Sequence, residues 1–247
     1  PMDFYIDHFS RVTSLDVHSK NNLLAIGFAG LSDPYIIIVT TTGQRIFLED
    51  VEYSEYPESV KISKNGKTFV VQTRNTIKIW SLNDGKIIAK LTRIGSIEGA
   101  FGPIAVSNDG SKLAYWNEQS QEVNVYDIEN KNSIAKFPCE SLVGPILCFN
   151  SDGTQLCIGG REIVLYDIKT GKKIKTFQEI PKNVHEIISK ALLSAIGRVY
   201  VSLSPDDKYL ATGNGKIIIW SLKTGVPLQT LVDINFEDVK RKLKALA

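Results

Sequence analysis

Residues 77–86 read IKIWSLNDGK, and this stretch decides the fold because related versions of it return along the chain. Each version is a short apolar run that ends on a large side chain and is followed by a polar turn. The other copies are IIIWSLKTG at 217–225, VNVYDI at 123–128, IVLYDIKTG at 163–171, and a worn copy with III at 36–38 ahead of a Thr-Gly pair. Five copies indicate a repeat protein.

The spacing of the copies indicates the kind of repeat. Taking Ile38, Trp80, Tyr126, Tyr166 and Trp220 as equivalent gives steps of 42, 46, 40 and 54 residues, and a period near forty is typical of propeller blades. About twenty residues before most copies lies a polar cluster between two apolar runs, which supplies the positive φ of a strand reversal. These clusters are Ser63–Gly66, Ser107–Gly110, Ser151–Gly153 and Ser204–Asp207. Each unit therefore predicts one blade of four short antiparallel strands.

The order and spacing of these elements resemble the WD-repeat β-propeller family over most of residues 3–231. The resemblance implies an all-β fold with five recognisable blades, at about residues 12–48, 58–91, 103–137, 145–177 and 199–231. The repeats are degenerate, because no aromatic strand carries the Trp-Asp dipeptide and the usual Gly-His pair survives only as Asp7-His8. The family's buried hydrogen-bond relay of His, Ser or Thr, Asp and Trp is therefore expected to be missing in this chain. Stability is expected to rest on the packing of the strands.

Residues 3–9 are expected to add one extra strand, and the blade count does not close neatly. Rings of this family usually have about seven blades, within a general range of about four to eight. The chain therefore forms a five-bladed or open ring, is part of a longer chain, or gains blades from a partner or a second copy.

Two helices are expected outside the blades. In the 54-residue step, apolar residues between 184 and 196 recur with helical spacing, Asn183 and Glu186 form a capping pair, and Gly197 is a suitable stop. A second amphipathic helix is expected over 235–246, with acidic residues first and basic residues last. The predicted division is a propeller over 1–232 and a terminal helix over 233–247.

Composition limits the cellular setting. The 247 residues contain no apolar run of about eighteen, so no membrane span is expected, and Pro1–Asp7 lack the pattern of a signal peptide. Three cysteines, an odd number, argue for a reducing compartment. Cys148 and Cys157 are expected to lie opposite each other across a turn, as small strand residues that stay reduced and react slowly. We expect a cytoplasmic protein, with a nuclear one as the alternative.

The sequence offers no pattern for catalysis. His8, His18 and His185 lack partner motifs and are interpreted as structural, and Gly27–Gly30 leads into a strand without the lysine of a phosphate loop. We therefore expect no catalytic residue, no cofactor and no metal. A net charge of +2 is too small to indicate nucleic-acid binding.

The family resemblance implies a non-catalytic scaffold for protein–protein interaction, a subunit or adaptor of an intracellular complex. The resemblance places four residues on the partner-binding face, each in or next to the turn before an aromatic strand: Arg74, Trp116, Arg161 and Lys216. The three cations would suit an acidic or phosphorylated segment. His185, Ile188 and Leu192 of the inserted helix are further candidates, either sealing the channel mouth or contacting a partner. The alternatives are a propeller-type hydrolase or lactonase with a channel metal, and a purely architectural incomplete propeller.

Overall fold

The computed structural model describes eleven stretches of the chain, residues 11–29, 35–40, 42–46, 48–49, 57–73, 75–92, 104–139, 144–160, 162–177, 199–213 and 216–233. Within them, twenty strands form five four-stranded antiparallel sheets, and each sheet takes its strands in chain order. Five four-stranded blades were predicted, and this number is confirmed.

The blades are numbered along the chain. Blade 1 contains β1 (Arg11–His18), β2 (Leu23–Ala29), β3 (Tyr35–Thr40) and β4 (Arg45–Ile46). Blade 2 contains β5 (Pro57–Ile62), β6 (Thr68–Thr73), β7 (Thr76–Ser81) and β8 (Ile87–Thr92). Blade 3 contains β9 (Ala105–Val106), β10 (Lys112–Asn117), β11 (Glu122–Asp127) and β12 (Asn132–Pro138). Blade 4 contains β13 (Ile146–Phe149), β14 (Gln155–Gly159), β15 (Ile163–Asp167) and β16 (Lys173–Phe177). Blade 5 contains β17 (Tyr200–Leu203), β18 (Tyr209–Gly213), β19 (Lys216–Ser221) and β20 (Pro227–Asp233).

The predicted polar clusters form the turns between the first and second strands. Gly66, Gly110 and Gly153 have φ values of 71°, 71° and 69°, and Asp207 takes the same place in blade 5 with a φ of 54°. Glycine adopts this left-handed conformation without steric cost, and aspartate tolerates it better than most residues do. The turn residues recognised in the sequence therefore reverse the chain where they were expected to.

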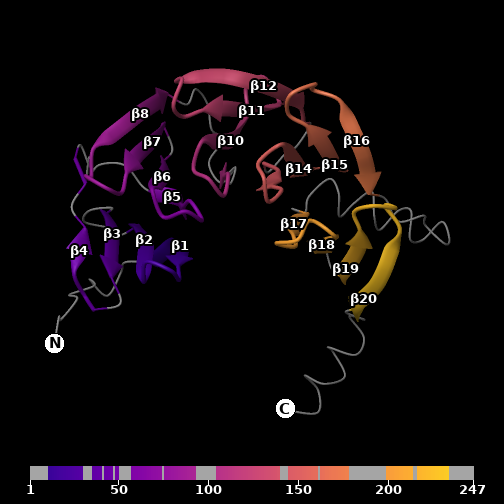
Figure 1. Cartoon of the computed structure of the whole chain (residues 1–247), viewed down its shortest axis with the longest axis horizontal. Helices are drawn as coiled ribbons and strands as arrows, with labels where there is room; N and C mark the ends of the chain where they lie inside the picture. Colours follow the sequence, from indigo (N-terminus) through magenta and orange to yellow (C-terminus); the bar gives the residue numbers. More distant parts are fainter. Residues whose placement is uncertain are drawn as a thin grey trace, which may run out of the picture.

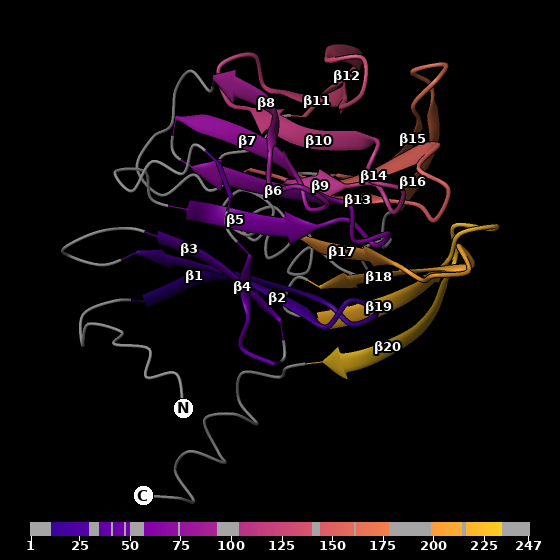
Figure 2. The same cartoon turned by 60° about the vertical axis from the view of Figure 1, so that its left-hand side comes forward.

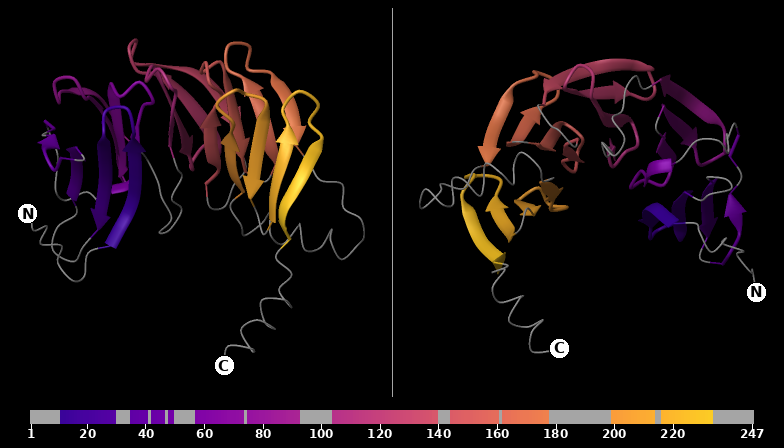
Figure 3. Two further views of the ribbon diagram at one scale, coloured as in Figure 1. Left: turned by 60° about the horizontal axis from the view of Figure 1, so that its bottom comes forward. Right: turned by 180° about the vertical axis from the view of Figure 1, so that it is seen from behind.

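The blades are arranged in an open arc. The first strand of each blade lies toward the centre and the fourth strand lies on the outer rim (Figure 1). Neighbouring sheets stack face to face around the arc (Figure 2). Blades 1 and 5 lie on either side of a gap, and their described strands do not pack against each other (Figures 1 and 3).

Each pair of neighbouring blades shares one apolar core. We call the sheet face that packs on the next blade along the chain the forward face, and the opposite face the rear face. In the second strands, Ala25, Val70, Ala114 and Cys157 lie on forward faces, and each belongs to the cluster formed with the next blade. Phe69, Leu113, Leu156 and Leu210 lie on the rear faces that meet them. Four such interfaces join the five blades.

The expected helices require a correction of the fold class. The described stretches contain strands and turns but no helix, and the segments 184–196 and 235–246 lie outside those stretches, as does the strand expected over residues 3–9. The fold is therefore stated as all-β. A stripe of apolar residues is only a local signal, and helices of twelve or thirteen residues depend on packing that such a pattern does not supply. No described residue belongs to a helix of the length and apolarity needed to span a membrane.

The structure also corrects the assignment of the worn repeat in blade 1. Trp80 pairs with Phe69, whereas the residue that pairs with the equivalent Leu24 is Val39 and not Ile38. Ile38 instead faces blade 2, in the same cluster as Ala25. The sequence does not identify the equivalent of Trp80 in blade 1, because residues 36–39 are all apolar. They show no alternation that would reveal which residues face forward.

Candidate interaction surfaces

Most of the residues predicted to contact a partner lie outside the part of the chain that the structure describes. Arg74, Arg161, His185, Ile188 and Leu192 lie outside the described stretches. Lys216 is the first residue of β19. The contacts predicted for these six residues stay predictions.

Trp116 lies in β10 and not in a turn. It pairs with Val123 and is 2% exposed, packed in the cluster between blades 3 and 4. Its indole Nε1 has no hydrogen-bond partner among the described residues, whereas Trp220 Nε1 donates to Thr212 Oγ1 at 2.9 Å and Trp80 Nε1 donates to Glu49 O at 2.7 Å. Since the ring is buried, we leave Trp116 out of any proposed contact surface.

Polar side chains in the first turns join neighbouring blades. His18 Nε2 donates to Lys64 O at 2.8 Å, while His18 Nδ1 accepts from Asn21 N at 3.1 Å. Asn108 Nδ2 donates to Ser151 O at 2.8 Å, and Ser151 N donates to Asp207 Oδ1 at 2.9 Å. The roles found for His18 and these turns are therefore structural, since their polar groups bond to the adjacent blade.

The pKa values of the shifted aspartate and tyrosine side chains lie further from neutral pH than their ordinary values do. Hydrogen bonds from Ser204 and Lys208 lower the pKa of Asp206 to about 2. Burial raises the pKa of the tyrosines Tyr115, Tyr126 and Tyr166. General acid–base catalysis favours groups whose pKa lies near the working pH, and these shifts have the opposite direction. Among the described residues, no group of three His, Cys, Asp or Glu side chains is placed to hold a metal ion.

The two strand cysteines lie as predicted. Cys148 and Cys157 are directly opposite each other in the register of β13 and β14, and they form no disulfide. Burial raises the pKa of both thiols, most strongly at the fully buried Cys157, so the thiolate is disfavoured. Their slow reaction with thiol reagents stays a prediction.

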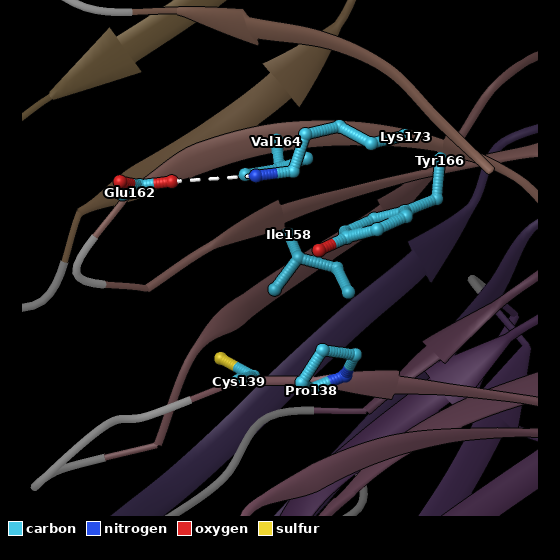
Figure 4. A pocket seen from close by; sticks show the side chains of 7 residues that line it. All are labelled: Pro138, Cys139, Ile158, Glu162, Val164, Tyr166 and Lys173. Carbon is cyan, nitrogen blue, oxygen red and sulfur yellow. Dashed lines mark ion pairs between the residues drawn. The ribbon is translucent and has the colours of Figure 1, made fainter. Parts of the chain in front are cut away.

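A cleft opens between blades 3 and 4. Its volume is about 360 Å³, and Glu162 Oε2 lies 3.6 Å from Lys173 Nζ along one wall (Figure 4). Both charged side chains are about half exposed, so the ion pair is screened by water. The other lining residues are Pro138, Cys139, Ile158, Val164 and Tyr166. Beyond this exposed pair the lining is mainly apolar, and Tyr166 adds a phenol whose pKa is raised by burial.

Exposed apolar side chains gather on the two end blades. Eight of the ten large exposed apolar residues in the described stretches belong to blade 1 or blade 5. Blade 1 exposes them along β1, and blade 5 exposes them on each of its four strands and at the residue before β20. They are Val12, Leu15 and Val17 in blade 1 and Tyr200, Tyr209, Ile217, Val226 and Leu228 in blade 5. The remaining two, Ile134 and Ile174, lie on outer strands of blades 3 and 4.

The exposure follows from the position of the blade and not from the residue type. Leu15 is opposite Ile26 in blade 1, and the paired residues at the same place in blades 2, 4 and 5 are Val60, Leu147 and Val201. In blade 3, Ile104 takes this place when the register of β9 and β10 is extended by one residue. These four are between 0% and 8% exposed, but Leu15 is 52% exposed. The rear faces of blades 2 to 5 are therefore buried against the preceding blade. No described blade covers the rear face of blade 1.

Comparison with known proteins supports the fold. The sequence matches no protein-family model and no curated protein. One similar solved structure is a chain in the crystal structure of a mitotic checkpoint complex, with a TM-score of 0.65 and 18% sequence identity over 90% of this chain. The present chain spans 66% of the length of that neighbour. As many as 1440 solved chains match, so the fold is widespread and does not by itself identify a function.

Proposed function

We propose that this protein is a non-catalytic protein–protein interaction scaffold that works as a subunit or adaptor of an intracellular complex. The observation that carries the proposal is the pair of apolar sheet faces at the ends of the arc, because contiguous exposed apolar surface marks interaction sites in soluble proteins. The likeness to one component of a multi-protein complex supports the same interpretation. So does the direction of the pKa shifts, which leaves Asp206 ionised and the Tyr166 phenol and Cys157 thiol protonated at neutral pH.

The intracellular setting is part of the proposal. Two cysteines that lie opposite each other on neighbouring strands and form no disulfide suit a reducing compartment. The contacts predicted for Arg74, Arg161 and Lys216 belong to the same proposal, with an acidic or phosphorylated segment as the partner.

The test is the size of the protein in an extract of its native source. Tagged protein is expected to migrate in an assembly much larger than its own 27.4 kDa. Leu15→Glu combined with Ile217→Glu is expected to release it as a folded monomer, because both side chains are exposed in the isolated chain. The matched control, Ile134→Glu combined with Ile174→Glu, changes exposed apolar residues on the outer rim and is expected to leave the assembly intact. Wild-type protein that migrates as a monomer would contradict the proposal.

A further inference from the structure

We propose that the cleft between blades 3 and 4 is a docking site for a short peptide segment of a partner protein. The segment would insert one large apolar side chain into the cleft and place an acidic residue beside it. The inference rests on the proposed scaffold function, and it names the site and the chemistry of one partner.

The cleft lies where blade 4 has smaller side chains than two other blades have. In the strand register, Tyr166 holds the place that Trp80 holds in blade 2 and Trp220 holds in blade 5. Both tryptophans are 1% exposed. Next to this place, Val164 stands where Lys78 lies buried in blade 2. The interface between blades 3 and 4 is therefore filled less completely, and about 360 Å³ stays open.

Tyr166 supplies a hydrogen-bond donor that has no partner. The residue is 8% exposed, and its ring lies against Phe137 of blade 3 with 4.5 Å between the centroids. Its hydroxyl points into the cleft toward Ile158, and among the described residues it forms no hydrogen bond (Figure 4). Buried tyrosine hydroxyls usually have a partner. Burial raises the pKa of this phenol, so it stays protonated and would donate to an acceptor such as a main-chain carbonyl of the bound segment.

The rest of the lining would hold an aliphatic or aromatic side chain. Ile158 and Val164 of blade 4 provide one apolar wall, and Pro138 and Cys139 of blade 3 provide the other. An apolar lining with a few polar groups is the usual composition of a recognition site. Leucine, methionine or phenylalanine in the partner would fit this lining.

The shape of the cleft suits a side chain better than a whole small molecule. Its volume is at the lower end of the range of about 300–1,000 Å³ found for small-molecule sites, which bury about 70% or more of the ligand surface. The side chains of Glu162 and Lys173 on its wall are 50% and 49% exposed, so the mouth is open to water. An extended peptide can lie across such a mouth and bury one side chain in it.

The charge beside the cleft favours an acidic segment. Residues 167–175 contain four lysines and one aspartate, whereas the corresponding residues 127–136 of blade 3 contain two lysines, one aspartate and one glutamate. Lys175 already donates to the carbonyl groups of the Leu222–Lys223 turn, but Lys169 and Lys172 are exposed on the same hairpin as Lys173. An acidic residue next to the apolar anchor would be attracted by these lysines, most strongly at low salt.

Selection from a random peptide library tests the proposal on the full chain. Peptides of twelve residues displayed on phage are selected on wild-type protein and counter-selected on Tyr166→Trp. This substitution would fill the cleft with the side chain that blades 2 and 5 carry at the same place. Peptides retained by wild type alone are expected to share one large apolar residue with an acidic residue close to it.

Synthetic copies of the retained peptides are then titrated by calorimetry. Replacing their shared apolar residue with alanine is expected to weaken binding about tenfold or more. Tyr166→Phe, which removes only the hydroxyl, is expected to weaken it about threefold to tenfold. The matched control is Tyr126→Phe at the same place in blade 3, and it is expected to leave the affinity unchanged. Circular dichroism checks that the variants fold.

Three outcomes would overturn the proposal. They are that wild type retains no peptide, that Tyr166→Trp binds the retained peptides as tightly as wild type does, and that Tyr166→Phe leaves the affinity unchanged. If Leu15→Glu combined with Ile217→Glu abolishes binding and the Tyr166 variants do not, the end blades hold the partner. The scaffold function then survives and the cleft site does not.

Discussion

Blades 2 to 4 and the two end blades are built from the same repeat, yet they differ in what covers them. Leu147 in blade 4 and Leu15 in blade 1 occupy the same repeat position, and they are 7% and 52% exposed. Because the residue type is the same, the difference comes only from the presence of a preceding blade. A repeat unit cannot bury its apolar faces alone and depends on its neighbours. Among the described residues, blade 3 covers Leu147, and no described blade covers Leu15.

The largest expected effect is on the free energy of unfolding of the isolated protein. Leu147→Ala is expected to lower it by about 2–5 kcal/mol, since the change leaves a cavity between blades 3 and 4. Leu15→Ala makes the same change at the matching position of blade 1 and is expected to lower it by less than about 1 kcal/mol. Chemical denaturation of both variants measures the difference. Equal losses would show that Leu15 is already covered in the isolated chain.

A smaller effect is expected from Gly159 and Gly213, which hold the same place in the second strands of blades 4 and 5. Gly159→Ala places a methyl group against the backbone oxygen of Val199 and is expected to cost about 1–3 kcal/mol of stability. Among the described residues, the methyl group of Gly213→Ala would meet Tyr200 of the same blade at 3.8 Å, so the change is expected to be neutral or to stabilise the isolated protein by up to about 1 kcal/mol. Thermal unfolding of the two variants checks this. If Gly213→Ala destabilises the isolated protein as much as Gly159→Ala does, the forward face of blade 5 is not open.

The smallest expected effect concerns the first turn of blade 5, at the open end of the arc. Hydrogen bonds from Ser204 and Lys208 hold the pKa of Asp206 near 2, below its ordinary value of 3.8. A lowered pKa in the folded state stabilises the protein above the ordinary value, and this contribution is lost as the pH falls toward 2. Asp206→Asn is therefore expected to be slightly less stable than wild type at pH 6. Urea midpoints of the two proteins are expected to converge near pH 2, and a difference that grows on acidification would contradict this.

Much of the fold could be predicted because its signals are local. The turn at Ser63–Gly66 needs a positive φ, and the sequence shows both the glycine and the polar residues that make such a turn. Likewise, the turn after Asn150 fixes the register that sets Cys148 opposite Cys157. Spacing near forty residues then gives the number of blades.

The parts that could not be predicted depend on neighbours in space. The sequence places Trp116 in or next to a turn, because it does not show that β10 continues to Asn117. The sequence predicts Ile38 at the position that Val39 holds, because an unbroken apolar run hides the register. An open ring is one of the alternatives that the sequence leaves, but the sequence does not show which leucine is covered, since Leu15 and Leu147 carry the same side chain.

The central claim is the proposal that partner proteins dock on the apolar faces of the two end blades, and hydrogen–deuterium exchange tests it most directly. Exchange is compared between the isolated protein and the assembly purified from its native source. The account predicts that assembly slows exchange in β1 and β2 of blade 1 and in β17 and β18 of blade 5, and leaves β10 nearly unchanged. Protection confined to other blades, or equal exchange of both end blades in the two states, would contradict it.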